Sequence, residues 1–289
     1  HDGKAVCTEE FVRAMQDASE VDLDQFQRWY HQAGTPTITA SGEYNAASER
    51  FTLRFTQSCA PTPDQAEKLP FHIPVAVGLI NADGNDLPLY PVNDEIVDGT
   101  TCVLSLTERE QAFSFENVPE TPVPSILRHF SSPVNLNYDY SDLDLAHLMA
   151  NDSDPFNRWE AGQRLAMNVI LNGISRHGQD DETVFPQALI EAVARILSDA
   201  DSDPAFAAEA LTLPGPGYIA EQLDEVDPEA ILRVRTALRK FIAANLEAKL
   251  RDTYKRFEVI GEYSPDPASA GRRALRNLCL GYLMELTSQ

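Results

Sequence analysis

The spacing of apolar residues along this chain of 289 residues changes twice, and each change marks a different kind of structure. Near the start, apolar side chains recur every three or four positions, the spacing of an amphipathic helix. We expect a first helix capped by Thr8, with Phe11 and Met15 on its apolar face. A second helix is expected to be capped by Asp22 and to end at Gly34 in the left-handed conformation. Its apolar face would contain Leu23, Phe26, Trp29 and Tyr30.

From residue 37 to residue 140, apolar and polar residues alternate, which is typical of half-buried β-strands. The alternation is clearest at residues 51–56 and 73–79. Further short strands are expected at 87–89, 101–106, 111–115, 125–130 and 134–140. Seven or eight short strands over about 100 residues predict an antiparallel, immunoglobulin-like β-sandwich. Prolines crowd positions 61, 63, 70 and 74, which predicts an extended loop and an edge strand, because proline cannot donate to a strand ladder.

The helical spacing returns after residue 141 and continues to the end of the chain. Asp-Pro pairs occur at 154–155, 203–204, 227–228 and 266–267. Asp as N-cap with Pro at the first helical position is a strong helix start signal. Helices restarted this regularly predict stacked helix pairs. We therefore expect a helical segment at residues 1–36, the β-sandwich at 37–141 and an all-α superhelical domain at 142–289.

Both ends of the chain resemble cuts in a longer protein. The chain begins at His1 with no initiator Met and no apolar signal core. The last apolar stretch, residues 275–286, is not followed by a polar capping helix, although solenoid ends usually need one. We therefore expect this chain to be a piece of a larger polypeptide.

The charge of the chain restricts its partners. The 23 basic and 45 acidic residues give a net charge of −22. Such a surface repels the phosphates of nucleic acids and anionic membranes, so neither is an expected partner. The four cysteines, Cys7, Cys59, Cys102 and Cys279, form no C-x-x-C pair and are interpreted as reduced thiols of a cytoplasmic protein. A disulfide between Cys59 and Cys102 stays open as an alternative.

The histidines give no local metal site. They are His1, His31, His72, His129, His147 and His177, and no two of them are three, four or five residues apart. His31 is interpreted as a helix-end residue, because a cation is favourable there. His72 and His129 fall on expected strands, as half-exposed positions. A zinc site assembled from distant histidines stays open.

Other short motifs also lack the pattern of an active site. There is no G-x-S-x-G elbow and no phosphate-binding G-x-x-x-x-G-K-[ST] loop. Residues 214–217 (PGPG) are interpreted as a turn between helices. Residues 81–86 (NADGND) are interpreted as a hairpin turn and not a calcium loop, because Asp86 and Val92 stand where such a loop needs Gly and Glu. The acidic run at 180–182 is interpreted as a solvated loop.

Two longer strings resemble a known family. Residues 28–36 (RWYHQAGTP) resemble the joint between the catalytic domain and the β-sandwich in bacterial aminopeptidase N, a family of zinc gluzincin metallo-aminopeptidases. Residues 62–74 (TPDQAEKLPFHIP) resemble that family's sandwich signature. Weaker matches occur at 44–45, 157–159 and 275–280. The resemblance follows the family's domain order: the end of the catalytic domain, the β-sandwich and the start of the helical superhelix.

The resemblance implies a portion of the enzyme that lacks its chemistry. The family binds zinc through an H-E-x-x-H helix and the substrate amine through G-x-M-E-N, and neither motif occurs here. We therefore assign no catalytic, cofactor-binding or metal-binding residue to this chain. Zinc and peptide substrates would belong to the intact parent. This chain, inactive alone, would supply spacer and chamber-forming domains that contact the missing catalytic domain and the remaining helices.

A free-standing sandwich-plus-helix module with a binding or scaffold role stays open as an alternative. A severed piece should expose large apolar patches where its neighbours belong, whereas a self-sufficient module should not. We expect such patches around Phe26, Trp29 and Tyr30 and on the helix that contains Leu278 and Tyr282.

Overall fold

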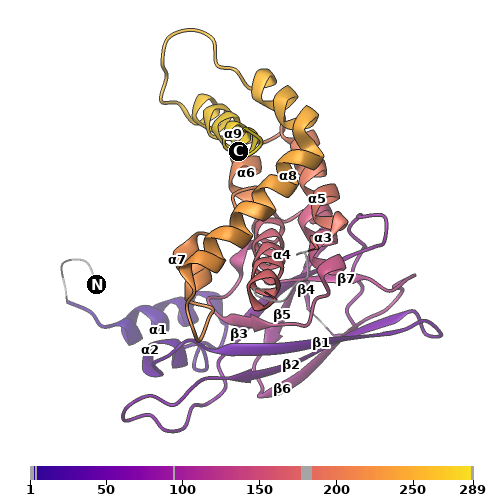
Figure 1. The fold of residues 1–289 in the computed structure, drawn as a ribbon. Helices are drawn as coiled ribbons and strands as arrows, with labels where there is room; N and C mark the ends of the chain where they lie inside the picture. Colours follow the sequence, from indigo (N-terminus) through magenta and orange to yellow (C-terminus); the bar gives the residue numbers. More distant parts are fainter. Residues whose placement is uncertain (1–2, 4, 94, 177–183, 288–289) are drawn as a thin grey trace. The chain divides into compact units, whose positions relative to one another are not determined.

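The computed structural model describes residues 3, 5–93, 95–176 and 184–287, and in it the chain forms two compact units (Figure 1). The first, here called the sandwich unit, comprises residues 1–139, and the second, the helical unit, comprises residues 140–289. His1, His177 and the acidic run at 180–182 lie outside the described residues.

The first helix, α1 (Thr8–Ser19), begins one residue earlier than predicted, at the residue expected to be its cap. Cys7 and not Thr8 is the N-cap, and its backbone N–H donates to the Glu10 carboxylate at 3.1 Å. The predicted apolar face is also wrong, since Phe11 is 60% exposed and Met15 is 52% exposed. Val12 is the buried residue of this helix, so α1 packs on the described chain through a narrower stripe than the spacing predicts.

The second predicted helix is much shorter than expected. Residues 24–27 form turns, and α2 (Arg28–His31) has only four residues. Asp22 does not cap it, because its carboxylate accepts the Asp24 N–H at 2.9 Å inside the preceding turn. Gly34 has φ of +98°, which confirms the left-handed residue expected there.

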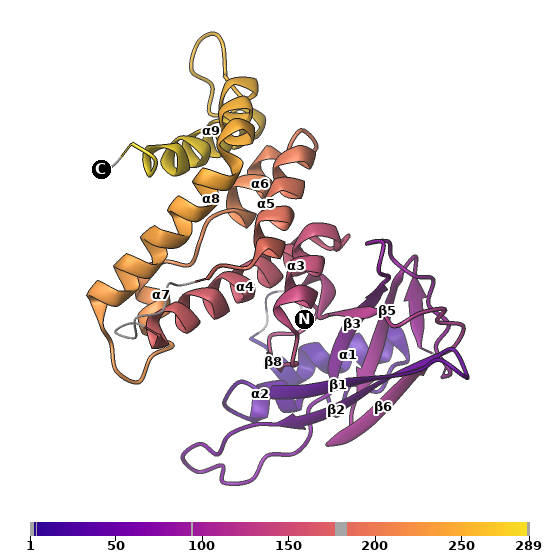
Figure 2. The same cartoon turned by 45° about the vertical axis from the view of Figure 1, so that its right-hand side comes forward.

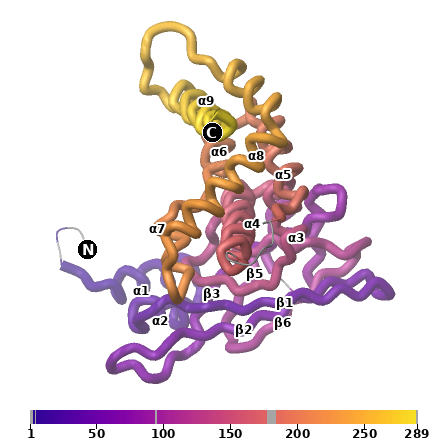
Figure 3. Tube along the Cα trace, in the orientation of Figure 1, coloured from indigo at the N-terminus to yellow at the C-terminus, as the bar shows by residue number. Residues whose placement is uncertain are grey.

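Two four-stranded sheets face each other in the sandwich unit (Figure 3), with strand orders β6-β2-β1-β8 and β4-β5-β3-β7. The strands are β1 (Thr37–Asn45), β2 (Arg50–Ser58), β3 (Ile73–Ile80), β4 (Ile96–Asp98), β5 (Thr101–Leu106), β6 (Glu110–Phe115), β7 (Val123–Ile126) and β8 (Asn135–Asn137). All pairs are antiparallel except β1 with β8. Phe51, Leu53 and Phe55 alternate into the core from β2, as their spacing predicts. The β-sandwich is therefore confirmed.

The prediction of an edge strand from the proline cluster that includes Pro74 is wrong. β3 is an interior strand, between β5 and β7. Pro74 is tolerated because β7 pairs only with residues 77–80 and does not reach it. Side chains cover the open stretch instead: Ser132 Oγ donates to the Pro74 carbonyl at 2.6 Å, and Ser131 Oγ accepts the Ala76 N–H at 3.0 Å.

The strand predicted at residues 125–130 ends early. β7 stops at Ile126, and a short 3-10 turn, η1 (Arg128–Phe130), follows. Leu127, His129 and Phe130 all have positive φ, from 50° to 65°, which no strand accommodates. His129 is therefore an exposed turn residue and not a strand position.

Two further strand predictions need correction, and one strand was not predicted. Leu87 and Leu89 are buried but lie outside the ladders. The last strand, β8, has three residues and not seven, and the edge strand β4 has no counterpart in the predictions. The turn at residues 81–86 is confirmed, with Gly84 N–H donating to the Asn81 carbonyl at 3.0 Å.

The helical unit, whose helices are drawn in Figure 2, confirms the helix starts predicted from the Asp-Pro pairs. Its helices are α3 (Asp142–Asn151), α4 (Pro155–Ser175), α5 (Gln187–Asp199), α6 (Pro204–Ala210), α7 (Pro216–Ala220), α8 (Pro228–Arg256) and α9 (Pro267–Met284). All four Asp-Pro pairs place Asp at the N-cap and Pro at the first helical position. Residues 214–217 are not only a turn, since Gly215 is the N-cap of α7. α3 packs on α4 and α8 packs on α9, as expected for stacked helix pairs.

Candidate functional site

The two strings that carry the family resemblance meet at one place in the sandwich unit. Lys68 lies at the centre of this contact and is only 7% exposed. Its ammonium donates to the Ala33 carbonyl at 2.9 Å, to Thr62 Oγ1 at 2.7 Å and to Gln65 Oε1 at 2.6 Å. Because an ammonium carries three N–H donors, these bonds use all of them. We call Lys68 and these three partners the clasp.

Gln65 bonds the same backbone from a second direction. Its Oε1 accepts the Ala33 N–H at 2.8 Å, and its Nε2 donates to the His31 carbonyl at 2.6 Å. The left-handed Gly34 follows directly, and a Cβ there would lie 3.1 Å from Cys59 Sγ. The turn that follows α2 therefore has little space for a side chain at position 34.

Aromatic and polar contacts extend the joint beyond the clasp. The rings of Trp29 and Phe71 have centroids 4.8 Å apart, and Trp29 Nε1 donates to the His72 carbonyl at 2.9 Å. Arg28 donates to the Pro70 carbonyl. Residues 28–34 are therefore attached to the loop between β2 and β3 by both backbone and side-chain contacts.

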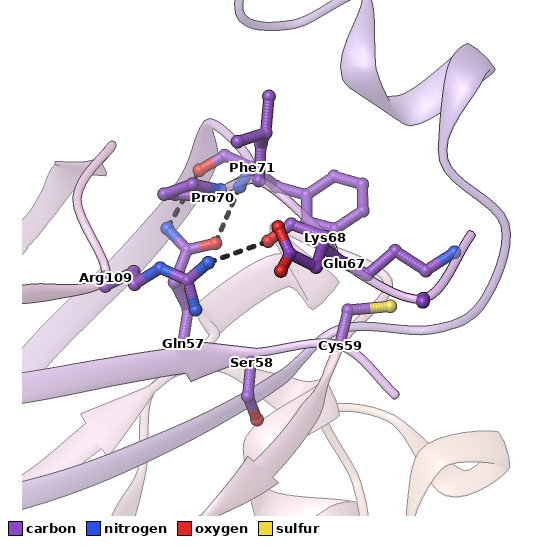
Figure 4. A pocket seen from close by; sticks show the side chains of 10 residues that line it. Gln57, Ser58, Cys59, Glu67, Lys68, Pro70, Phe71 and Arg109 are labelled. Carbon is purple, nitrogen blue, oxygen red and sulfur yellow. Dashed lines mark hydrogen bonds between the residues drawn. The ribbon is translucent and has the colours of Figure 1, made fainter. Parts of the chain in front are cut away.

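The same loop is fixed from its other side and borders a cavity of about 380 Å³ (Figure 4). Gln57 is buried; it accepts the Phe71 N–H at 2.7 Å and donates to the Phe71 carbonyl at 2.9 Å. Arg109 Nη2 donates to the Lys68 carbonyl at 2.9 Å. Bonds from both sides thus hold the loop in one conformation.

The expected apolar patches are only partly present. Tyr30 is 53% exposed, but Trp29 and Phe26 are half-buried. On α9, Tyr282 is buried and its hydroxyl donates to the Leu211 carbonyl at 2.8 Å. The exposed large apolar residues of that helix are Leu280 and Met284.

His31 and His72 have separate partners. His31 Nε2 lies 4.0 Å from a Glu9 oxygen, and His72 Nε2 lies 2.7 Å from Ser105 Oγ. A zinc site needs three or four ligands close together. Within residues 3, 5–93, 95–176 and 184–287, no three His, Cys, Asp or Glu side chains form such a group.

The cysteines are free thiols, and the Cys59–Cys102 disulfide considered above is not formed. Burial, with a smaller contribution from Glu95, raises the pKa of the Cys102 thiol to about 12. Burial also raises the pKa of Cys279 to about 12. These two thiols therefore stay protonated at neutral pH and are poor nucleophiles.

Sequence reasoning assigned no functional residue, and the joint came to notice only through the resemblance. Its polar groups serve attachment: the Lys68 ammonium, the Arg28 guanidinium and neutral donors and acceptors hold the two segments together. The helices of the described chain also lack any segment with the length and hydrophobicity to cross a membrane.

Comparisons with known proteins agree with this architecture. Residues 142–289 match a domain of unknown function with ARM repeats (DUF3458_C), and residues 34–139 match a domain of unknown function with an Ig-like fold (DUF3458). The chain is 42% identical over 287 residues to aminopeptidase N of Escherichia coli K12, covering 98% of this chain and 32% of that protein.

Two further relatives are also aminopeptidases, and the chain matches about a third of each. Aminopeptidase N of Caulobacter vibrioides is 42% identical over 279 residues, covering 96% of this chain and 31% of that protein. The crystal structure of Legionella pneumophila aminopeptidase A in complex with aspartic acid matches with a TM-score of 0.82 and 25% identity, covering 99% of this chain and 32% of that one. The chain thus spans about a third of the length of the curated relatives that it matches.

Proposed function

The chain belongs to the DUF3458_C family of ARM-repeat domains, and we propose that it is the non-catalytic portion of a zinc-dependent aminopeptidase that removes N-terminal residues from peptides. The observation that carries the proposal is the alignment of 98% of the chain with aminopeptidase N at 42% identity. The described residues assemble no zinc ligand set, so the proposal assigns no step of zinc chemistry to them.

Each part of the chain has a mechanical role in this proposal. Residues 1–36 would be the last part of the catalytic domain, and residues 37–141 would be the spacer. Residues 142–289 would form the first part of the helical wall of the substrate chamber. The clasp supports the spacer role of the sandwich, because it attaches residues 31–33 to the sandwich through bonds to their backbone. The proposed location is the cytoplasm, which the four free thiols support.

The first test separates a portion of a longer enzyme from a free-standing module. An antibody raised against this chain should detect, in extracts of its source cells, a polypeptide about three times its 32.0 kDa mass. The same band should hydrolyse an alanyl anilide after immunocapture, and a zinc chelator should abolish that activity. Detection of a band at 32.0 kDa alone would overturn the proposal.

A companion assay uses the purified chain itself. With zinc supplied, its hydrolysis of the same anilide should not exceed that of a chelator-treated sample. Aminopeptidase N of Escherichia coli K12 serves as the positive control for the assay. A zinc-dependent rate that stays with the chain through purification would contradict the non-catalytic assignment.

A further inference from the structure

The cavity beside the clasp is lined by two side chains of opposite charge (Figure 4). Glu67 contributes a carboxylate from the loop between β2 and β3, and Arg109 contributes a guanidinium from the turn between β5 and β6. Ser58, Leu69 and Pro70 also line this cavity. The volume of about 380 Å³ is within the usual range for sites that hold a small molecule.

These two charges are not neutralised within the described chain. Arg109 Nη2 donates to the Lys68 carbonyl, and within the part of the chain that the structure describes this guanidinium makes no other hydrogen bond or ion pair. Among the described residues, the Glu67 carboxylate makes no hydrogen bond or ion pair, and the two side chains do not pair with each other. A carboxylate and a guanidinium thus border one cavity, each able to accept a further charged partner.

The walls that carry these charges are already fixed. Lys68, adjacent to Glu67, is held by three hydrogen bonds, and Phe71 is held at both backbone groups by Gln57. A ligand that binds here does not have to order the loop, which removes one of the main costs of binding.

We propose that this cavity binds a free α-amino acid, with its ammonium on Glu67 and its carboxylate on Arg109. A ligand with a single charge would leave one of the two groups without a partner, whereas a zwitterion satisfies both. A small apolar side chain would lie against Pro70 and Leu69. Because both charged groups are exposed, the dissociation constant should be about millimolar. The inference does not depend on the proposed function.

The test is an NMR titration of the backbone amides of the full chain with L-alanine up to about 50 mM. Propionate and ethylammonium, which each carry one of the two charges, are the comparison ligands. We expect saturable shifts at residues 66–71 and 109 with alanine, and binding at least about tenfold weaker with either comparison ligand. Equal binding of propionate and alanine, or no saturable shift with alanine, would overturn the proposal.

Variants then assign the two charges. Glu67→Gln is the most informative, because its carboxylate has no partner to lose, and it should weaken alanine binding about tenfold. Arg109→Gln should weaken it similarly, with thermal unfolding measured to verify that the loop remains folded. Glu43→Gln, which removes the same charge from an exposed pair with Arg54, is the matched control and should bind like the parent. If Glu67→Gln binds alanine as tightly as the control, the assignment is wrong.

Discussion

Lys68 places an ammonium group in the interior of the sandwich unit and bonds it to three neutral oxygen atoms. Burying a charge is costly unless hydrogen bonds replace its water, and here every N–H has an acceptor within 2.9 Å. Two of the acceptors belong to the loop between β2 and β3, and the third is the Ala33 carbonyl. The ammonium thus links two segments, since Lys68 and Ala33 are 35 residues apart in the sequence.

Replacing Lys68 by Met tests this link. Methionine has a similar length but no donor, so the carbonyl, hydroxyl and amide oxygens of the clasp lose a buried partner. We expect the free energy of unfolding to fall by about 2–4 kcal/mol, measured by urea denaturation, and amide exchange at residues 31–34 to accelerate. Lys255→Met, at an exposed position of α8, is the matched control and should change stability by less than about 0.5 kcal/mol. Equal midpoints for the two variants would contradict the role of Lys68.

The burial of Lys68 is a feature of the clasp that could not be predicted from the sequence. Periodicity gives no sign that Lys68 is buried, since it follows Glu67 in a polar, proline-rich loop that resembles any solvated surface. Its burial comes from a contact with Ala33, far away in the sequence. Only the family resemblance of the two strings singled out these segments, and it did not indicate that they bond to each other.

At the scale of elements, the most reliable signals were those contained within four consecutive residues. Each Asp-Pro pair starts a helix because the Asp carboxylate accepts an N–H of the first turn and Pro has no N–H to leave unbonded. The necessary partners are all local, so tertiary structure has little opportunity to override them.

The cap of α8 gives a quantitative test of this reasoning. The Asp227 carboxylate accepts the N–H groups of Glu229 and Ala230, each at 3.0 Å. Asp227→Ala should lower the free energy of unfolding by about 1 kcal/mol, whereas Asp227→Asn should retain most of the stability, because Asn also caps helices well. Asp224→Ala, in the exposed turn before the helix, is the control for loss of charge. If thermal unfolding shows that Asp224→Ala loses as much stability as Asp227→Ala, the capping role is wrong.

Elements whose ends depend on contacts with residues far away in the sequence were predicted less well. Residues 125–130 have the alternation of a strand, yet the chain turns after Ile126 because Arg128 is drawn into the interior. The Arg128 guanidinium bonds Asp86 at 2.5 Å and occupies the space that a side chain at Gly78 would need. Asp86 and Gly78 are far from Arg128 in the sequence, so the three residues with positive φ have no local signal.

At the scale of the whole molecule, the chain consists of two units that each have a hydrophobic core. The core of the sandwich unit lies between its two sheets, and that of the helical unit lies among α3 to α9. The change in periodicity near residue 141 indicated this division, because a switch from alternation to helical spacing marks a change in how apolar residues are buried.

Separate cores predict that each unit folds alone. We expect the pieces 1–139 and 140–289 each to unfold cooperatively in urea, with circular dichroism spectra that sum to that of the intact chain. The cut preserves both sheets on one side, including β8 beside β1, and on the other side it preserves the Ser141 N-cap of α3. A cut between residues 100 and 101 is the control, because it separates β5 from both β3 and β4, and neither of its pieces should contain a folded sandwich. If the piece 1–139 or the piece 140–289 unfolds without cooperativity, the two units depend on each other for stability and the description of separate cores is wrong.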